Sequence, residues 1–297
     1  MSFFTETTIA LYGKAGQGWL DSLPDLLAKY AQLWDLEIGA PFMGLSYNFV
    51  APAKRADRTR AVIKTGFPNS ELDTEIAALR HFDGCSTVYL YEADREQSIF
   101  LLERAKPGKS LWKMEDERAI NILLDILPSL WRTYEGDFPF PSVNDYARGF
   151  SRLRNRYQGG TGPFDTFIID KAENIFTELI ESSDDPVLLH GDLHHGNILS
   201  AERELWLAID PKGVIGEPCY EIGAFLRNPI PGLLKKENPR ALLTQRVDKI
   251  VERLGFDRQR VIGWAFSQAV LAAIWCDEDN LSCGNELINC AEIIESS

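Results

Sequence analysis

The sequence predicts an α+β protein of two lobes, because its first hundred residues are rich in strand-like segments and the remainder is mainly helical in pattern. The chain has 297 residues, which is long enough for two domains or for one large two-lobed unit. The change from one pattern to the other falls near residues 105–108. We therefore expect one lobe over residues 1–104 and a second over residues 105–297.

The first predicted lobe is a small antiparallel sheet with an embedded helix. An initial helix is expected over residues 19–36, where apolar side chains recur every three to four positions. The embedded helix begins at Asn69 or Ser70, either of which can cap it. Its apolar stripe comprises Leu72, Ile76, Leu79 and Phe82. Short runs separated by turn-prone residues predict strands over 43–52, 59–66, 86–92 and 98–103.

The second predicted lobe is built mainly from helices, and one strand–loop–strand unit over residues 186–211 interrupts them. The helices are expected over residues 115–134, 143–157, 164–183, 219–227, 239–253 and 257–277.

The composition is that of a folded globular protein with an acidic surface. Hydrophobic residues make up 45% and charged residues 25%, which argues against a disordered chain or a membrane protein. The formal net charge of −13 repels a polyanion such as DNA and attracts a cationic small molecule, although acidity by itself also serves solubility. We therefore expect a small cationic substrate as partner, with no nucleic acid and no membrane.

The location of the protein follows from two further patterns. The first residues show no basic segment ahead of an apolar stretch, and no run of about 18 apolar residues occurs. The five cysteines are an odd number, are widely spread and form no Cys-x-x-Cys pair, so the sequence indicates neither a zinc ribbon nor a disulfide framework. We expect a cytoplasmic protein.

The chemistry is concentrated in residues 187–199, where an apolar run leads into a polar cluster that contains Asp192 and Asn197. A second apolar run, residues 205–209, ends in Asp210. Two acids and an amide at neighbouring strand ends suit a hard cation that prefers oxygen ligands, together with one acceptor for a hydroxyl proton. The sequence therefore predicts a site that holds a hard cation beside a group that accepts a hydroxyl proton.

The same residues resemble a known pattern. Asp192 and Asn197 have the spacing of the protein-kinase catalytic loop. His190-Gly191-Asp192 and the later Asp210 look like the version of the aminoglycoside phosphotransferase family, and the chain most resembles its streptomycin 6-phosphotransferase and hydroxyurea phosphotransferase group. The likeness extends from the strand that carries Lys64 almost to the end of the chain, and includes residues 208–213, 216–221 and 264–270.

The resemblance implies a bilobal, protein-kinase-like fold, in which residues 1–104 bind nucleotide and residues 105–297 carry the catalytic and substrate residues. It also implies that Asp192 orients, or deprotonates, the attacking hydroxyl and that Asn197 and Asp210 hold Mg²⁺. Lys64 would meet the α- and β-phosphates and Glu75 would pair with it. The helical pattern agrees independently, because Glu75 borders the buried stripe of its helix.

Other nucleotide contacts implied by the resemblance are less distinctive. Residues 101–105 would form the hinge that meets adenine, with Glu103 and Ala105 as its contacts. Ser46 lies where a glycine-rich phosphate loop is expected, although residues 44–48 contain a single glycine. Pro211 and Lys212 follow Asp210 in place of the usual kinase triplet, and Lys212 either contacts phosphate or pairs with an acid. The choice between ATP and GTP stays open.

The acceptor site is expected near the end of the helix over 257–277, where acids oppose the helix dipole. In the family that this chain resembles, acids of this region face ammonium or guanidinium groups of the substrate. We therefore assign substrate contacts to Glu278 and Asp279, with Trp275 as a stacking wall. The other candidate substrate contacts are His195 and Lys212.

Several side chains near the motif have structural interpretations too. Three of the four histidines lie in one loop, but zinc would need further ligands at fitting positions, and His190 is better explained as a hydrogen-bond donor that braces the loop. His194 and His195 either contact phosphate or substrate or only line the loop. Glu221 and Arg227 are expected to form an ion pair.

The predicted function is ATP- and Mg²⁺-dependent phosphoryl transfer to a hydroxyl of a small cationic molecule, such as streptomycin, or to hydroxyurea. A rival in the same fold is a metabolic kinase for choline, a sugar or a hydroxylated amino acid. A rival of another class is a pseudokinase that binds nucleotide and acts as a scaffold. The joint presence of Lys64, Glu75, Asp192, Asn197 and Asp210 argues against the scaffold. The sequence leaves the choice between monomer and dimer open.

Overall fold

The computed structural model describes residues 3–183 and 185–297 and divides into two compact units. Unit 1 comprises Met1–Gly108 with Ser200–Leu207, and unit 2 comprises Lys109–Leu199 with Ala208–Ser297. The expected boundary after residue 104 and the functional roles of the two lobes stay predictions.

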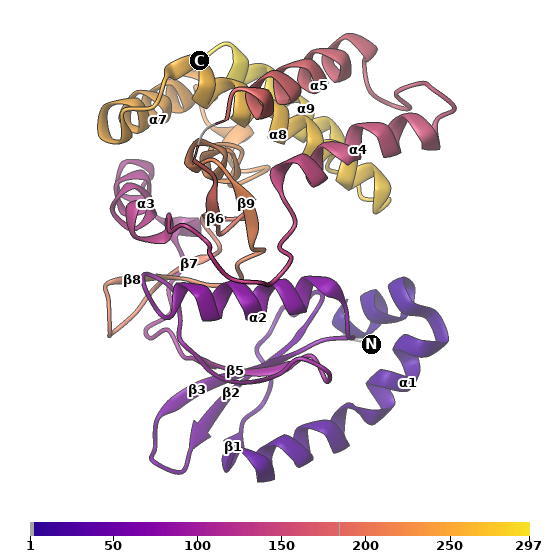
Figure 1. Cartoon of the computed structure of the whole chain (residues 1–297), viewed down its shortest axis with the longest axis vertical. Coiled ribbons are helices and arrows are strands. Elements are labelled where there is room, and N and C mark those ends of the chain that lie inside the picture. The colour runs from indigo at the N-terminus through magenta and orange to yellow at the C-terminus, as the bar shows by residue number, and fades with distance from the viewer. Residues whose placement is uncertain (1–2, 184) are drawn as a thin grey trace. The chain divides into compact units, whose positions relative to one another are not determined.

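Unit 1 contains an antiparallel five-stranded sheet with the strand order β1-β2-β3-β5-β4 (Figure 1). Its strands are β1 (Leu36–Ile38), β2 (Phe49–Arg55), β3 (Arg60–Thr65), β4 (Leu90–Asp94) and β5 (Ile99–Glu103). Side chains along β3 alternate between the two faces. Ile63 joins an apolar cluster with Tyr30 and Leu101, whereas the next residue, Lys64, reaches Glu75.

Two of the predicted strands begin later than expected. The strand expected over 43–52 starts only at Phe49, because Gly44 adopts a positive φ of 76° in a turn that no extended strand accommodates. The strand expected over 86–92 starts at Leu90, after Ser86 at a φ of 51°. The three-residue strand β1 was not predicted, because it directly follows the helical pattern of the preceding segment.

The two helices of unit 1 are α1 (Phe3–Leu33) and α2 (Ser70–Phe82). The first is longer than the predicted helix and is kinked at Gly13, whose φ of 58° lies outside the helical region. The second is confirmed, including its cap: the Asn69 side chain accepts a hydrogen bond from the Leu72 backbone N–H. Its predicted apolar stripe is buried, and Glu75 at the border of that stripe is buried with it.

Unit 2 is mainly helical, and its longest helix lies among the others (Figure 1). Its helices are α3 (Asp116–Leu130), α4 (Val143–Arg156), α5 (Thr166–Glu181), α6 (Ile222–Leu226), α7 (Pro239–Leu254), α8 (Arg258–Glu278) and α9 (Gly284–Glu295), with short 3₁₀ turns at Leu111–Lys113, Pro218–Glu221 and Leu233–Lys235. Residues 261–271 of α8 are buried on every side, as expected for a core helix that contacts α4, α5, α6, α7 and α9.

Four short strands interrupt these helices: β6 (Val187–Leu189), β7 (Ile198–Ser200), β8 (Trp206–Ala208) and β9 (Val214–Gly216). β6 pairs with β9 and β7 pairs with β8. The segment that groups with unit 1, Ser200–Leu207, contains the connection between β7 and β8 together with the last residue of β7 and the first two residues of β8. The predicted strand–loop–strand unit is thus present, with its polar loop between β6 and β7.

The cysteine prediction was wrong in one respect. Cys276 at the end of α8 and Cys283 at the start of α9 form a disulfide, with Cα atoms 6.0 Å apart. Their spacing carries no motif, and helix α9, whose start lies beside the end of α8, was not predicted from the sequence. Within residues 3–183 and 185–297, no helix has the length and hydropathy needed to cross a membrane.

Candidate active site

The loop after β6 is held by His190, whose side chain is fully buried. Its Nε2 lies 2.8 Å from the carbonyl oxygen of Ile209, and its Nδ1 accepts a hydrogen bond from the Asp192 backbone N–H at 3.3 Å. A carbonyl oxygen can only accept, so the proton belongs on Nε2. Burial lowers the pKa of His190 to about 4, which keeps the ring neutral in this arrangement. The predicted bracing role of His190 is confirmed.

A second brace, Glu221, was missed in this role. Its carboxylate accepts hydrogen bonds from the backbone N–H groups of His190 at 2.7 Å and Gly191 at 2.9 Å. Burial raises the pKa of Glu221 to about 7, although these donors favour the charged form. The expected ion pair between Glu221 and Arg227 was wrong, because the carboxylate binds the loop backbone and Arg227 points to Asp192.

Gly191 is required at the turn itself. Its φ is +83°, and a Cβ at this position would lie 2.9 Å from Val214 Cγ1. The chain therefore turns sharply between the buried strand and the polar residues that follow it.

Unit 2 brings Asp192, Asn197 and Asp210 together. The Asn197 Nδ2 donates to the Asp192 carbonyl oxygen at 3.0 Å, and the Ile209 backbone N–H donates to the Asn197 carbonyl oxygen at 2.9 Å. Asp210 follows Ile209 directly and has a φ of 57°, a left-handed conformation that Asp tolerates better than most residues. These hydrogen bonds to backbone carbonyl oxygens thus position Asp192, Asn197 and Asp210 relative to one another.

The Asp192 carboxylate lies between two nitrogen-bearing side chains. Arg227 NH2 is 3.6 Å from Oδ1, and His194 Nε2 is 3.8 Å from Oδ2. His194 Nδ1 accepts from the Gly196 backbone N–H at 2.9 Å, so the ring proton is on the nitrogen that faces Asp192. Burial lowers the pKa of His194 and favours this neutral form. The sequence had left the role of His194 open and had not placed Arg227 beside Asp192.

The residues expected to meet nucleotide in unit 1 include a buried ion pair. Lys64 Nζ lies 2.7 Å and 2.8 Å from the two carboxylate oxygens of Glu75, which is the predicted pairing. The Glu103 side chain is held by Arg203, at 2.9 Å in the closest contact. Ser46 lies in the irregular segment before β2, and Ala105 lies just after β5. The nucleotide contacts of these residues stay predictions.

Two acids at the end of α8, Asp277 and Glu278, already have partners on α4 or directly after it. Glu278 forms a two-pronged ion pair with Arg152, with contacts of 2.8 Å and 3.0 Å. The preceding acid, Asp277, accepts from the Tyr157 hydroxyl at 3.0 Å. Trp275 packs edge-to-face against Tyr146, with ring centroids 5.5 Å apart. Asp279 is exposed at the helix end. The expected contacts of Glu278, Asp279 and Trp275 with a substrate cation stay predictions. A cation that binds the Glu278 carboxylate would compete with Arg152 for it.

Of the other two candidate substrate residues, His195 lies in the loop between β6 and β7, and Lys212 lies between β8 and β9. His195 is 2% exposed, and its ring stacks on Phe225 with centroids 3.9 Å apart. This packing weighs against the predicted substrate contact. The Lys212 backbone N–H donates to the His190 carbonyl oxygen at 2.7 Å, so residue 212 helps to hold the loop.

The donor set fits Mg²⁺ better than zinc. In the described part of the chain, no three His, Cys, Asp or Glu side chains are grouped so as to hold a metal ion. Mg²⁺, by contrast, commonly takes one or two protein oxygens and completes its shell with phosphates and water. With its Nδ2 bound to Asp192, Asn197 has its Oδ1 as the amide atom for a cation, and Asp210 supplies a carboxylate.

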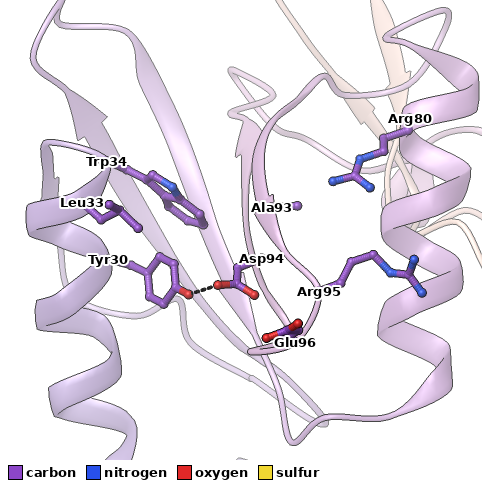
Figure 2. A pocket seen from close by; sticks show the side chains of 8 residues that line it. All are labelled: Tyr30, Leu33, Trp34, Arg80, Ala93, Asp94, Arg95 and Glu96. Carbon is purple, nitrogen blue, oxygen red and sulfur yellow. Dashed lines mark hydrogen bonds between the residues drawn. The ribbon is translucent and has the colours of Figure 1, made fainter.

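A cavity of about 460 Å³ lies in unit 1, between the end of α1 and the turn from β4 to β5 (Figure 2). Tyr30 and Trp34 line one side, Arg80 and Arg95 line the other, and the Tyr30 hydroxyl donates to Asp94. None of the predicted site residues lines it.

Known proteins are similar to this chain in sequence and in fold. The chain is 30% identical to a streptomycin 6-kinase of Streptomyces glaucescens over 276 residues, which is 90% of this chain and 87% of the relative. It is 31% identical to a hydroxyurea phosphotransferase of Kitasatospora aureofaciens over 286 residues, 92% of this chain and 79% of the relative. A solved choline kinase, LicA from Streptococcus pneumoniae, superposes with a TM-score of 0.65 at 13% identity over 93% of this chain and 100% of its own.

These comparisons confirm the predicted kinase-like α+β fold, with a small antiparallel sheet in unit 1 and a larger helical unit 2. Residues 36–280, most of the chain, match the family of aminoglycoside/hydroxyurea antibiotic resistance kinases. Because that match and the two relatives agree on the sequence group predicted from the His190–Asp210 region, the chain belongs to the aminoglycoside/hydroxyurea antibiotic resistance kinase family.

Proposed function

We propose that this protein transfers the γ-phosphate of ATP to a hydroxyl of a small molecule, either a cationic aminoglycoside-type antibiotic such as streptomycin, or hydroxyurea. The observation that carries the proposal is the network in unit 2 that brings Asp192, Asn197 and Asp210 together. Family membership supports the reaction class, because the curated relatives are kinases and phosphotransferases.

Each residue has one task in this reaction. Asp192 accepts the hydrogen bond of the attacking hydroxyl and fixes its direction. Asn197 and Asp210 hold Mg²⁺, which when bound offsets negative charge on the phosphate oxygens. Lys64, kept in place by Glu75, contacts the α- and β-phosphates. The protein acts by positioning and electrostatics, because phosphoryl transfer requires little covalent participation from side chains.

A cationic acceptor agrees with the charge of the protein. The net charge of −13 raises the local concentration of cations around the molecule. Trp275, Glu278 and Asp279 are the proposed acceptor contacts, with Lys212 assigned to phosphate. The proposed location is the cytoplasm, where ATP and Mg²⁺ are available.

A transfer assay with radiolabelled ATP tests the function. Streptomycin, hydroxyurea and choline are offered separately, with and without Mg²⁺, and the product is identified by mass spectrometry. We expect Mg²⁺-dependent phosphorylation of streptomycin or hydroxyurea, and none with Asp192→Asn. Transfer to choline alone would establish a metabolic kinase instead. ATP binding without transfer to any acceptor would support the scaffold.

A further inference from the structure

Asp192 is connected to the core helix α8 through one guanidinium group. Arg227, at the end of α6, places NH2 3.6 Å from Asp192 Oδ1, and its NH1 donates to Gln268 Oε1 at 3.1 Å. The Arg227 side chain is 12% exposed, so solvent screens this contact less than it would an ion pair on the surface. Gln268 and the Asp192 carboxylate therefore contact the same guanidinium group.

The Gln268 amide has only one orientation that satisfies its neighbours. Its Nε2 donates to the Tyr220 carbonyl oxygen, which can only accept, and its Oε1 faces Arg227, which can only donate. If the amide were turned over, its nitrogen would face the Arg227 donor and its oxygen would face the Tyr220 carbonyl oxygen, so neither hydrogen bond could form. The oxygen is thus held toward Arg227 by a backbone group on the other side.

The Gln268 amide packs against α6 at Gly223, where there is no side chain. A Cβ at Gly223 would lie 2.5 Å from Gln268 Cδ, so only glycine allows the amide to cross the helix at this point. Gln268 is 6% exposed and lies in the stretch of α8, residues 261–271, that is buried on every side. A core helix packs well with an apolar side chain, and burying an amide is costly unless both of its ends are bonded. Packing alone therefore does not account for glutamine here.

The contact also has an electrostatic setting. Asp192 and Asp210 carry negative charge in the same loop region, and the proposed reaction adds phosphate groups there. A guanidinium beside Oδ1 offsets part of that charge and restricts rotation of the Asp192 carboxylate. A carboxylate that is misdirected by a fraction of an ångström costs rate without changing affinity.

We propose that Gln268 is a positioning residue for phosphoryl transfer, acting through Arg227 to orient the Asp192 carboxylate. This inference rests on the proposed function, because it takes Asp192 as the residue that receives the acceptor hydroxyl.

A double-mutant cycle tests it. We expect Gln268→Leu to lower kcat about tenfold and Arg227→Ala about a hundredfold, with KM for ATP and acceptor changed less than about twofold. In the double variant the effect of Gln268→Leu disappears, because the guanidinium through which it acts is absent. The matched control is Gln245→Leu on the exposed face of α7, which should keep wild-type kcat.

Thermal unfolding identifies variants that fail to fold. If Arg227→Ala does not fold, Arg227→Lys takes its place in the cycle. Wild-type kcat in Gln268→Leu, or effects that multiply in the double variant, would overturn the proposal. The NMR signal of the Arg227 Nε–H group provides a readout that needs no activity, and it should shift or broaden in Gln268→Leu but not in Gln245→Leu. An unchanged signal would contradict the contact itself. No transfer by the wild type, with the expected NMR shift, would overturn the proposed function and the catalytic meaning of the contact, while leaving the contact established.

Discussion

The His190 ring donates from Nε2 to the carbonyl oxygen of Ile209, which directly precedes Asp210. One buried side chain thus ties the loop of Asp192 and Asn197 to the strand end that presents Asp210. The same ring accepts from the Asp192 backbone through Nδ1. The imidazole therefore fixes the backbone of Asp192, which is proposed to receive the hydroxyl proton, relative to the backbone next to Asp210, a proposed metal ligand.

We expect His190→Leu to lower both stability and turnover. It keeps an apolar body of similar size but leaves the Ile209 carbonyl without its buried donor, at a cost of about 1–3 kcal/mol in the free energy of unfolding. The shift of Asp192 relative to Asp210 should lower kcat by about 10²-fold. Urea unfolding and steady-state kinetics measure the two effects. Full turnover in a folded His190→Leu protein would show that the loop does not depend on this ring.

Asp192→Asn separates chemistry from folding. The amide is nearly the same size, but it loses the negative charge that receives the hydroxyl proton, so we expect kcat to fall by about 10²- to 10⁴-fold with the melting temperature nearly unchanged. Asp125→Asn, on the surface of α3, is the matched control and should keep wild-type turnover. ATP-dependent transfer at the wild-type rate would remove Asp192 from the mechanism.

Asp210 is best tested with asparagine. The left-handed conformation at residue 210 is strained for alanine but tolerated by asparagine, so Asp210→Asn removes the carboxylate charge with little strain on the backbone. We expect loss of the Mg²⁺-dependent part of nucleotide affinity, measured by calorimetry with Mg²⁺ and with EDTA. Asp210→Ala should abolish Mg²⁺-dependent binding as well. Equal affinities in wild type and Asp210→Asn under both conditions would exclude Asp210 as the metal ligand.

The parts of the site that could be predicted are those encoded by local spacing. Asp192 and Asn197 share one loop, and Glu75 follows from the period of its own helix. Glu221 and Gln268 could not be assigned their contacts, because the hydrogen bonds of Glu221 to His190 and of Gln268 to Arg227 span 31 and 41 residues. Such pairings depend on how the helices pack, and single-sequence patterns carry no signal for that.

The same distinction holds for the fold. The apolar stripe of α2 was predicted correctly, since one helix face determines it. The strand expected over 43–52 was wrong in its first half because a turn at Gly44 depends on backbone conformation rather than on hydrophobic pattern. The Cys276–Cys283 disulfide depends on the end of α8 meeting the start of α9. The hydrophobic pattern of the sequence carries neither the backbone conformation at Gly44 nor the packing of α9 beside α8.

Glu221 predicts a pH dependence of stability. Its folded pKa of about 7 lies above the usual value of 4.5, so the folded protein binds the proton more tightly than the unfolded chain. Between about pH 4.5 and 7 the folded state holds more protons, and this group's contribution to the free energy of unfolding falls as pH rises. The slope is about 1.4 kcal/mol per pH unit at most.

Glu221→Gln, which does not titrate, isolates this contribution. We expect the stability of the wild type relative to Glu221→Gln to fall as pH rises from 5 to 7, measured by urea unfolding at each pH. A difference that is constant with pH would show that the carboxyl group keeps its ordinary pKa in the folded protein.

Substitutions in the Arg152–Glu278 ion pair test whether the acceptor substrate binds at the end of α8. If a cationic acceptor binds Glu278, it must displace Arg152, so the two substitutions have opposite effects. Arg152→Ala frees the carboxylate and should lower KM for streptomycin by about two- to fivefold, while Glu278→Gln should raise it by a similar factor. KM for ATP should stay constant in both variants. If the pair only braces α4 against α8, both variants will have lower melting temperatures, and KM for the acceptor will move in the same direction or not at all.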